Sequence, residues 1–187
     1  MAPGTSTRLT YEDYLLLPED GRRYEILDGE LYVNASPLRK HQAVLRDLVF
    51  RIGAYLEEHP IGSVYFAPFD VVLSEHDVVQ PDLLFISNER EQIITHKNVS
   101  GAPDLAVEIL SESSRKTDEI TKRKRYERFG VSEYWVMDPV LETVKVYRRE
   151  GDRFARMAEL STEEGAALTS PLFPGLRINL TKVFAAR

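Results

Sequence analysis

The sequence reads VVQPDLLFI at residues 78–86 and DLAVEIL at residues 104–110, two short apolar stretches that each contain a carboxylate. Their length and polar flanks predict two buried β-strands. Side chains alternate between the two faces of a strand, so Asp82 and Glu108 point into one cleft if the strands are neighbours. Two buried carboxylates repel each other, and each then needs a proton, a cationic partner or a metal ion.

The composition is that of a globular chain, with 187 residues, 43% hydrophobic and 29% charged. This length predicts a single domain over residues 1–187 with a sizeable core. Residues 1–7 lack the charged start and apolar stretch of a signal peptide, and no apolar run is long enough to span a bilayer. We therefore expect a cytoplasmic protein with no membrane contact.

The metal chemistry open to the chain is narrow. It has no cysteine, which excludes disulfides and thiolate metal sites, and its four histidines are scattered. Zinc prefers sulfur and imidazole ligands, whereas magnesium and manganese accept oxygen ligands alone. Any cofactor is therefore expected to be Mg²⁺ or Mn²⁺ held by carboxylates.

Cap, turn and periodicity signals predict the other elements. An Asp28-Gly29 turn predicts a β-hairpin over residues 23–33, in which Ile26 pairs with Leu31 and Tyr24 with Val33. Helices are expected at residues 11–17, 36–58 and 117–130, with caps at Thr10, Ser36 and Thr117. Further strands are expected at residues 63–67, 69–73, 133–137 and 143–148. Strands separated by two main helices are typical of an α/β domain with a mixed sheet.

Positive charge is concentrated in the segment after Glu108. Residues 115–129 contain seven Lys or Arg and three Asp or Glu, a local charge of +4 in a chain whose net charge is −6. An acidic chain does not coat nucleic acid non-specifically, so contact with phosphates needs such a local patch. The residues expected to make that contact are Lys116, Arg123, Lys124 and Arg125. A solvated, salt-bridged helix face is the alternative interpretation.

Three residues of the same segment, Asp118, Lys122 and Tyr126, follow one another at i+4 steps and so lie on one helix face. His41 lies on the apolar stripe of the predicted helix 36–58. A histidine in that position is either a buried, hydrogen-bonded core residue or part of a site.

The order of these residues resembles the PD-(D/E)xK nuclease superfamily and, more narrowly, the Uma-type restriction endonucleases. The similarity runs from about Thr10 to Phe184. The motifs that carry it are YEILDGE at residues 24–30, His41, Pro81-Asp82, residues 104–110, and the Asp118/Lys122/Tyr126 spacing. It implies a restriction-endonuclease-like mixed β-sheet flanked by helices, and metal-dependent hydrolysis of phosphodiester bonds in DNA.

The resemblance also implies roles for individual residues. Asp82, Glu108 and the backbone carbonyl of Ile109 would hold Mg²⁺ or Mn²⁺. A further acid would come from an earlier element, with Glu25 the first choice and Glu30 or Asp70 as substitutes. His41, Asp118 and Tyr126 would support the site.

One position departs from the superfamily pattern. Leu110 occupies the place, two residues after the strand acid, where a lysine usually stands. The resemblance then implies that the amine has moved to the following helix, with Lys122 the first candidate and Lys124 the second. If neither lysine reaches the acids, the fold is kept and the nuclease activity is lost.

Two other classes of function stay open at this point. One is a catalytically degenerate protein that keeps the fold and binds nucleic acid, and the other is a scaffold in which Asp82, Glu108 and Lys122 form a structural network. Carboxylates about 4–6 Å apart around an ion favour the enzyme, because charges and metals act at that range. Carboxylates closed off by apolar side chains favour the scaffold. Cleavage of both strands would suit a symmetric homodimer.

Overall fold

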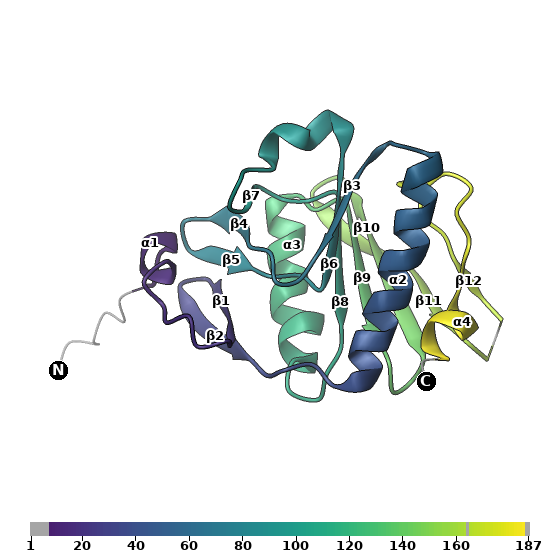
Figure 1. Ribbon diagram of the computed structural model, residues 1–187, viewed down its shortest axis with the longest axis horizontal. Coiled ribbons are helices and arrows are strands. Elements are labelled where there is room, and N and C mark those ends of the chain that lie inside the picture. Colours follow the sequence, from purple (N-terminus) through teal and green to yellow (C-terminus); the bar gives the residue numbers. More distant parts are fainter. Residues whose placement is uncertain (1–7, 164, 186–187) are drawn as a thin grey trace.

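A computed structural model describes residues 8–163 and 165–185, and residues 1–7, on which the signal-peptide expectation rests, lie outside this range. A six-stranded sheet lies between helix α2 (Arg39–Glu58) and helix α3 (Arg123–Phe129) (Figure 1). Its strands are β3 (Gly62–Phe66), β6 (Leu83–Ser87), β8 (Leu105–Ile109), β9 (Glu133–Asp138), β10 (Thr143–Glu150) and β11 (Arg153–Ser161). The order is β11-β10-β9-β8-β6-β3, with β8 and β9 parallel and the other neighbours antiparallel, so the predicted mixed sheet is confirmed.

A second, five-stranded sheet lies beside the first and contains the hairpin (Figure 1). Its order is β2 (Glu30–Asn34), β1 (Arg23–Leu27), β5 (Asp77–Val79), β4 (Val71–Ser74) and β7 (Val99–Ser100). The Asp28-Gly29 turn pairs Ile26 with Leu31, as predicted. Both turn residues have positive φ, 57° and 80°, the backbone that a two-residue hairpin turn requires.

The predicted strand 78–86 is wrong as a single element. It is two strands, β5 and β6, which belong to different sheets and are joined by Gln80-Pro81-Asp82. Pro81 has no N–H to donate and restricts the backbone of Gln80, whose N–H bonds the Glu25 carboxylate instead of a strand. Asp82 therefore lies at the corner between the sheets, just before β6.

Two helix starts differ from the prediction. Helix α2 begins after Leu38 rather than at Ser36, and no side chain caps it. The helix expected to start at Thr117 is already helical at Arg115, because the Asp118 N–H bonds the Ser114 carbonyl. It continues as a π-helical segment, η2 (Thr117–Lys122), and then as α3, which ends at Gly130 with φ 92°.

The smaller elements are α1 (Tyr11–Tyr14), η1 (Asn88–Ile93), α4 (Leu180–Phe184), β12 (Ala167–Leu168) and β13 (Ile178–Asn179). Helix α1 has the capping box expected at Thr10, reciprocated by Asp13, but is shorter than predicted. No helix among the described residues is both long and apolar enough to cross a membrane.

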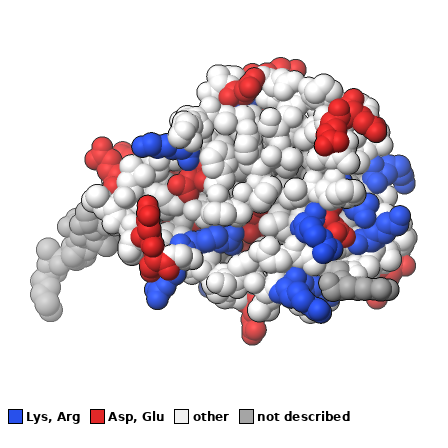
Figure 2. All heavy atoms as spheres, viewed as in Figure 1, with Lys and Arg blue, Asp and Glu red and all other residues white. Residues whose placement is uncertain are grey.

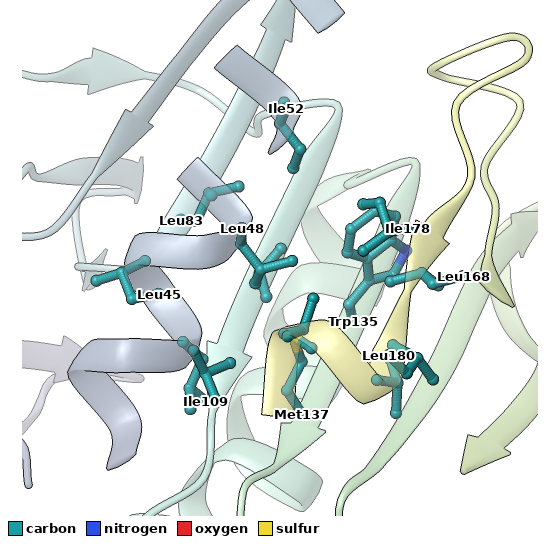
Figure 3. Close-up of a cluster of buried hydrophobic side chains, with 14 of the residues drawn as sticks. Leu45, Leu48, Ile52, Leu83, Ile109, Trp135, Met137, Leu168, Ile178 and Leu180 are labelled. Carbon is teal, nitrogen blue, oxygen red and sulfur yellow. The ribbon is translucent and has the colours of Figure 1, made fainter. Parts of the chain in front are cut away.

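The core covers both faces of the six-stranded sheet. On one face Leu45, Leu48 and Ile52 of α2 pack against the strands and the C-terminal segment (Figure 3). On the other face Tyr126 of α3 packs with Ala106 and Tyr134. Alternation along β8 sends Val107 and Ile109 to the α2 side and Glu108 to the α3 side. A carboxylate is thereby placed inside an apolar layer.

Candidate active site

The two sequence-predicted acids lie at adjacent positions on neighbouring strands. β6 and β8 pair with Leu83 opposite Val107, so one further step along the ladder places Asp82 opposite Glu108. The Ile109 N–H donates to Asp82 Oδ2 over 2.8 Å. Asp82 and Glu108 are only 2% and 3% exposed. The expected juxtaposition of the two carboxylates is confirmed, although Asp82 reaches it from a connector and not from within a strand.

Lys122 lies among three carboxylates from three different elements. Its Nζ is 2.9 Å from Glu25 Oε2, 3.0 Å from Glu108 Oε1 and 3.3 Å from Asp118 Oδ1. An ammonium has three N–H donors and no acceptor, so three carboxylates match its donor count. Burial alone would lower the pKa of Lys122, but Glu108, Glu25 and Asp118 together raise it well above its usual value. Lys122 is therefore a fixed positive charge at neutral pH.

The surroundings of Glu108 oppose its ionisation. Burial raises its pKa well above the usual value, and the nearby Asp118, Asp82 and Glu25 charges add to the effect that Lys122 opposes. The Tyr126 hydroxyl donates to Oε1 over 2.7 Å, the same oxygen that Lys122 binds. Burial and then Glu108 raise the pKa of Tyr126 well above its usual value, so Tyr126 stays a phenol and a donor. Within the described residues no hydrogen bond reaches Oε2 of Glu108.

Asp82 is held in the opposite state. Burial would raise its pKa, but the hydrogen bond and charge of His41, the Ile109 N–H and the Arg23 charge together lower it. His41 Nε2 lies 3.0 Å from Oδ2, and Arg23 lies 3.3 Å from Oδ1. His41, for which the sequence left a core role and a site role open, thus contacts a site acid directly. Asp82 is a carboxylate at neutral pH, beside a Glu108 that resists ionisation.

Among the three acids considered for the earlier element, only Glu25 contacts the cluster. It is fully buried, accepts from the Gln80 N–H and from Asn34 Nδ2, each over 2.7 Å, and binds Lys122. Glu30 is exposed, and Asp70 bonds Tyr14 and Gln80 instead.

The expectation of a broad basic face on the helix is weakened by the ion pairs that it forms. Arg125 lies 3.0 Å from Asp28 and 3.5 Å from Asp77, and Arg123 lies 5.2 Å from the centroid of the Tyr147 ring. Lys116 and Lys124 are exposed. In the view of Figure 2, positive and negative side chains form separate small patches, and positive ones gather over the region of α2 and the C-terminal segment. Of the four expected phosphate contacts, Lys116 and Lys124 are the ones left freely accessible.

A small cavity of about 20 Å³ opens onto the cluster and is lined by Asp82, Glu108, Lys122, Asp118 and His41, with Arg23 and three serines around them. A space of this size holds about one water molecule or ion. Within the described residues there is no group of three or more His, Cys, Asp or Glu arranged to hold a metal. Asp82, Glu108 and the Ile109 carbonyl still fit Mg²⁺, because that ion takes one or two carboxylates and keeps several waters.

Five polar residues of the site were missed in the sequence: Arg23, Asn34, Ser111, Ser113 and Ser114. A signal for the first two exists, because Arg23 and Glu25 share a face of β1 by alternation, and Arg23 pairs with Asn34 in the hairpin register. Ser114 bonds Ser111 in the loop before the helix. The only sequence signal for this loop was its cap-forming residue types.

The chain was compared with known proteins. A family model, Uma2, described as "Putative restriction endonuclease", matches residues 11–181. A crystal structure described as a putative nuclease from Anabaena variabilis is 22% identical and superposes with a TM-score of 0.79, covering 95% of this chain and 98% of that one. The type IIG restriction endonuclease BpuSI superposes with a TM-score of 0.40 at 11% identity, over 82% of this chain and 16% of that enzyme, too weak a likeness to support an argument. No curated protein matches.

Proposed function

Because the chain belongs to the Uma2 family, we propose that it is a metal-dependent endonuclease that hydrolyses phosphodiester bonds in DNA, and that it works in the cytoplasm. The observation that carries the proposal is the position of Lys122, whose Nζ lies 3.0 Å from Glu108, the acid opposite Asp82. A strand acid, a second acid at the strand corner and an amine thus meet at one cavity, although the amine comes from a helix.

Asp82, Glu108 and the Ile109 carbonyl are the residues that would hold Mg²⁺ or Mn²⁺. When bound there, such an ion would polarise the scissile phosphate and lower the pKa of a bound water. The lowered pKa of Asp82 keeps it an anionic ligand. The raised pKa of Glu108 means that this acid must lose its proton to bind a metal, and the charge of Lys122 favours that loss. Tyr126 and Lys122 both bind Oε1 of Glu108, which leaves Oε2 for a ligand.

Lys122 serves as a charge and a hydrogen-bond donor, not as a general base. Its raised pKa keeps the amine protonated, so it has no lone pair with which to take a proton from water. Its three N–H donors are matched by the three carboxylates, so its contribution is a positive charge that can offset negative charge growing on the phosphate. Glu25 and Asp118 fix its position, and the proton released by the water is assigned to a carboxylate of this cluster.

The polar lining of the cavity favours the enzyme over a purely structural network. A network that only stabilises the fold would be closed off by apolar side chains. Here Arg23, Asn34 and the serines 111, 113 and 114 line the space beside the acids. Leu110 in the usual lysine position remains the observation that favours the degenerate, binding-only alternative.

The test is incubation of the protein with DNA and RNA in Mg²⁺, Mn²⁺ or EDTA. Wild type is expected to cut DNA in the presence of either metal and not in EDTA, and Asp82→Ala is expected to be inactive. Lys182→Ala, which changes an exposed lysine of α4 that does not line the small cavity, is the control and should stay active. Binding of DNA without cleavage under every metal condition would instead establish the degenerate alternative.

Cleavage of both strands of a duplex requires two such centres, and a homodimer is the simplest way to supply them. Sedimentation of the protein alone and with DNA measures this. A monomer in both cases would limit the enzyme to nicking one strand at a time.

A further inference from the structure

A second hollow, of about 420 Å³, adjoins the small cavity. Its apolar surface comes from Leu38 before α2, Leu110 after β8, and Pro139 and Val140 in the turn between β9 and β10. His41 and Ser111 line both this groove and the small cavity, so the two spaces lie next to each other on either side of these residues. The proposed function uses the small cavity and leaves this groove unassigned.

The groove exposes more apolar surface than the fold requires. Leu38 is 75% exposed and Val140 is 77% exposed. Exposed apolar side chains gathered in one place mark surfaces that bind something. Neither residue supports the core, because neither belongs to the two buried clusters.

The charged residues around the groove do not make it a phosphate site. Lys40 lies 3.3 Å from Glu142, and Arg115 lies 2.7 Å from Asp138, so both cations are already paired. Glu112 adds a further negative charge to the lining. A surface whose centre is aliphatic and whose charges are balanced suits the flat face of a nucleobase better than a phosphate group.

His41, which lines both the groove and the small cavity, has one polar atom without a partner in the part of the chain that the structure describes. Nδ1 of His41 is buried and has no hydrogen-bond partner among the described residues, while Nε2 bonds Asp82. A buried polar atom without a partner is uncommon in a folded protein, and a ligand can supply the partner. The polar edge of a base, or its sugar, offers the donors and acceptors that an imidazole nitrogen needs.

We propose that this groove holds an unpaired nucleobase next to the scissile phosphate, so that the substrate is DNA with a base out of its stack at the cleavage site. The inference rests on the proposed nuclease function. The cluster cavity admits only an ion, a water or a phosphate oxygen, whereas the groove has the volume and the apolar surface for a base. Base contacts with apolar side chains compensate the cost of unstacking, which is smallest where the base is already unpaired.

The test uses DNA duplexes that carry 2-aminopurine either paired with thymine or opposite an abasic site, bound in EDTA so that no cleavage occurs. Wild type is expected to bind the unpaired form more tightly, with a rise in fluorescence as the base leaves the stack. The double variant Leu38→Ser/Val140→Ser should lose this preference, with a dissociation constant weaker by about 10-fold for the unpaired form. Serine at position 38 is a favourable residue at a helix N-cap, so α2 is preserved.

Phe50→Ser is the matched control, because Phe50 is a 72% exposed apolar residue on the same helix and lines a different surface. It should bind both duplexes as wild type does. Equal binding of the two duplexes by wild type, or equal effects of Phe50→Ser and the double variant, would overturn the inference. If wild type and the double variant cut the paired and the unpaired duplex equally well in Mg²⁺, the nuclease function stands while this inference fails. A wild type that neither binds nor cuts would remove both.

Discussion

Lys122 is buried at the centre of the site, so its removal should affect the stability of the fold. Loss of the ammonium in Lys122→Met leaves Glu25, Glu108 and Asp118 buried without a cation, and breaking such a cluster costs about 3–5 kcal/mol. From the sequence alone this lysine is the first candidate for the displaced amine, and its removal is expected to affect activity. We now expect Lys122→Met to be inactive and also to melt at a clearly lower temperature than wild type at pH 8.

The loss in Lys122→Met should shrink at low pH. Without the ammonium the buried acids keep pKa values above their unfolded values, so their protonated forms stabilise the fold below the unfolded pKa and that stability is lost as pH rises. Melting temperatures of variant and wild type from pH 4 to pH 8 measure this. Lys124→Met, in an exposed position, should follow wild type throughout, and a constant gap for Lys122→Met would argue against the ion cluster.

Asp82 and Glu108 give a second prediction at the scale of single residues. A ligand that binds only the folded state raises its stability by about 2.7 kcal/mol at 100 times its dissociation constant. Millimolar Mg²⁺ or Mn²⁺ should therefore raise the melting temperature of wild type. Glu108→Gln keeps the size of the side chain and should abolish the increase. An unchanged melting temperature of wild type across this range of metal would count strongly against a metal site.

At the scale of elements, the turn between β9 and β10 is held by one carboxylate. Asp138 Oδ1 accepts from the N–H groups of Val140 and Leu141 over 2.9 and 3.0 Å, and Oδ2 lies 2.7 Å from Arg115. Burial would raise the pKa of Asp138, but the Arg115 hydrogen bond and the two turn N–H groups lower it below its usual value. The turn is thereby tied to the start of the helix that carries Lys122.

Asp138→Asn should accordingly destabilise the protein at neutral pH and not in acid. A lowered folded pKa gives stability above the unfolded pKa that disappears as pH falls through the folded pKa. The expected loss is about 1.5–3 kcal/mol at pH 7, because hydrogen bonds to charged groups have this range. Urea denaturation at pH 7 and below pH 3 measures it. Asp152→Asn, at an exposed turn position, is the control.

The elements also show how far the sequence could be interpreted. The hairpin register, the juxtaposition of the two acids and the Asp118/Lys122/Tyr126 face were predicted, because alternation and i+4 spacing are local properties. The break of residues 78–86 into two strands was not, since it depends on the Gln80 N–H finding Glu25, 55 residues away in the sequence. Arg125 likewise finds its partners far away in the sequence. It pairs with Asp28 and Asp77, which could not be inferred from the helix alone.

At the scale of the whole molecule, the net charge of −6 restricts how nucleic acid can bind. Association must use a local patch, and the ion pairs of Arg115 and Arg125 leave Lys116, Lys124 and Arg128 as the exposed positive positions within residues 115–129. Arg123→Glu and Arg125→Glu are poor tests, because the second also breaks the contact of α3 with the hairpin. The informative change is Lys116→Glu/Lys124→Glu.

That double variant should weaken DNA binding and flatten its salt dependence. Each phosphate contact contributes about 0.9 to the slope of log K against log salt, so two lost contacts should reduce the slope by about 1.8. Lys97→Glu/Lys182→Glu changes the net charge equally at exposed positions on other elements and is the control. Fluorescence anisotropy over a series of salt concentrations measures both. Equal slopes for the two double variants would mean that overall charge, and not the helix beside the acids, governs binding, and the helix would then be only a solvated face.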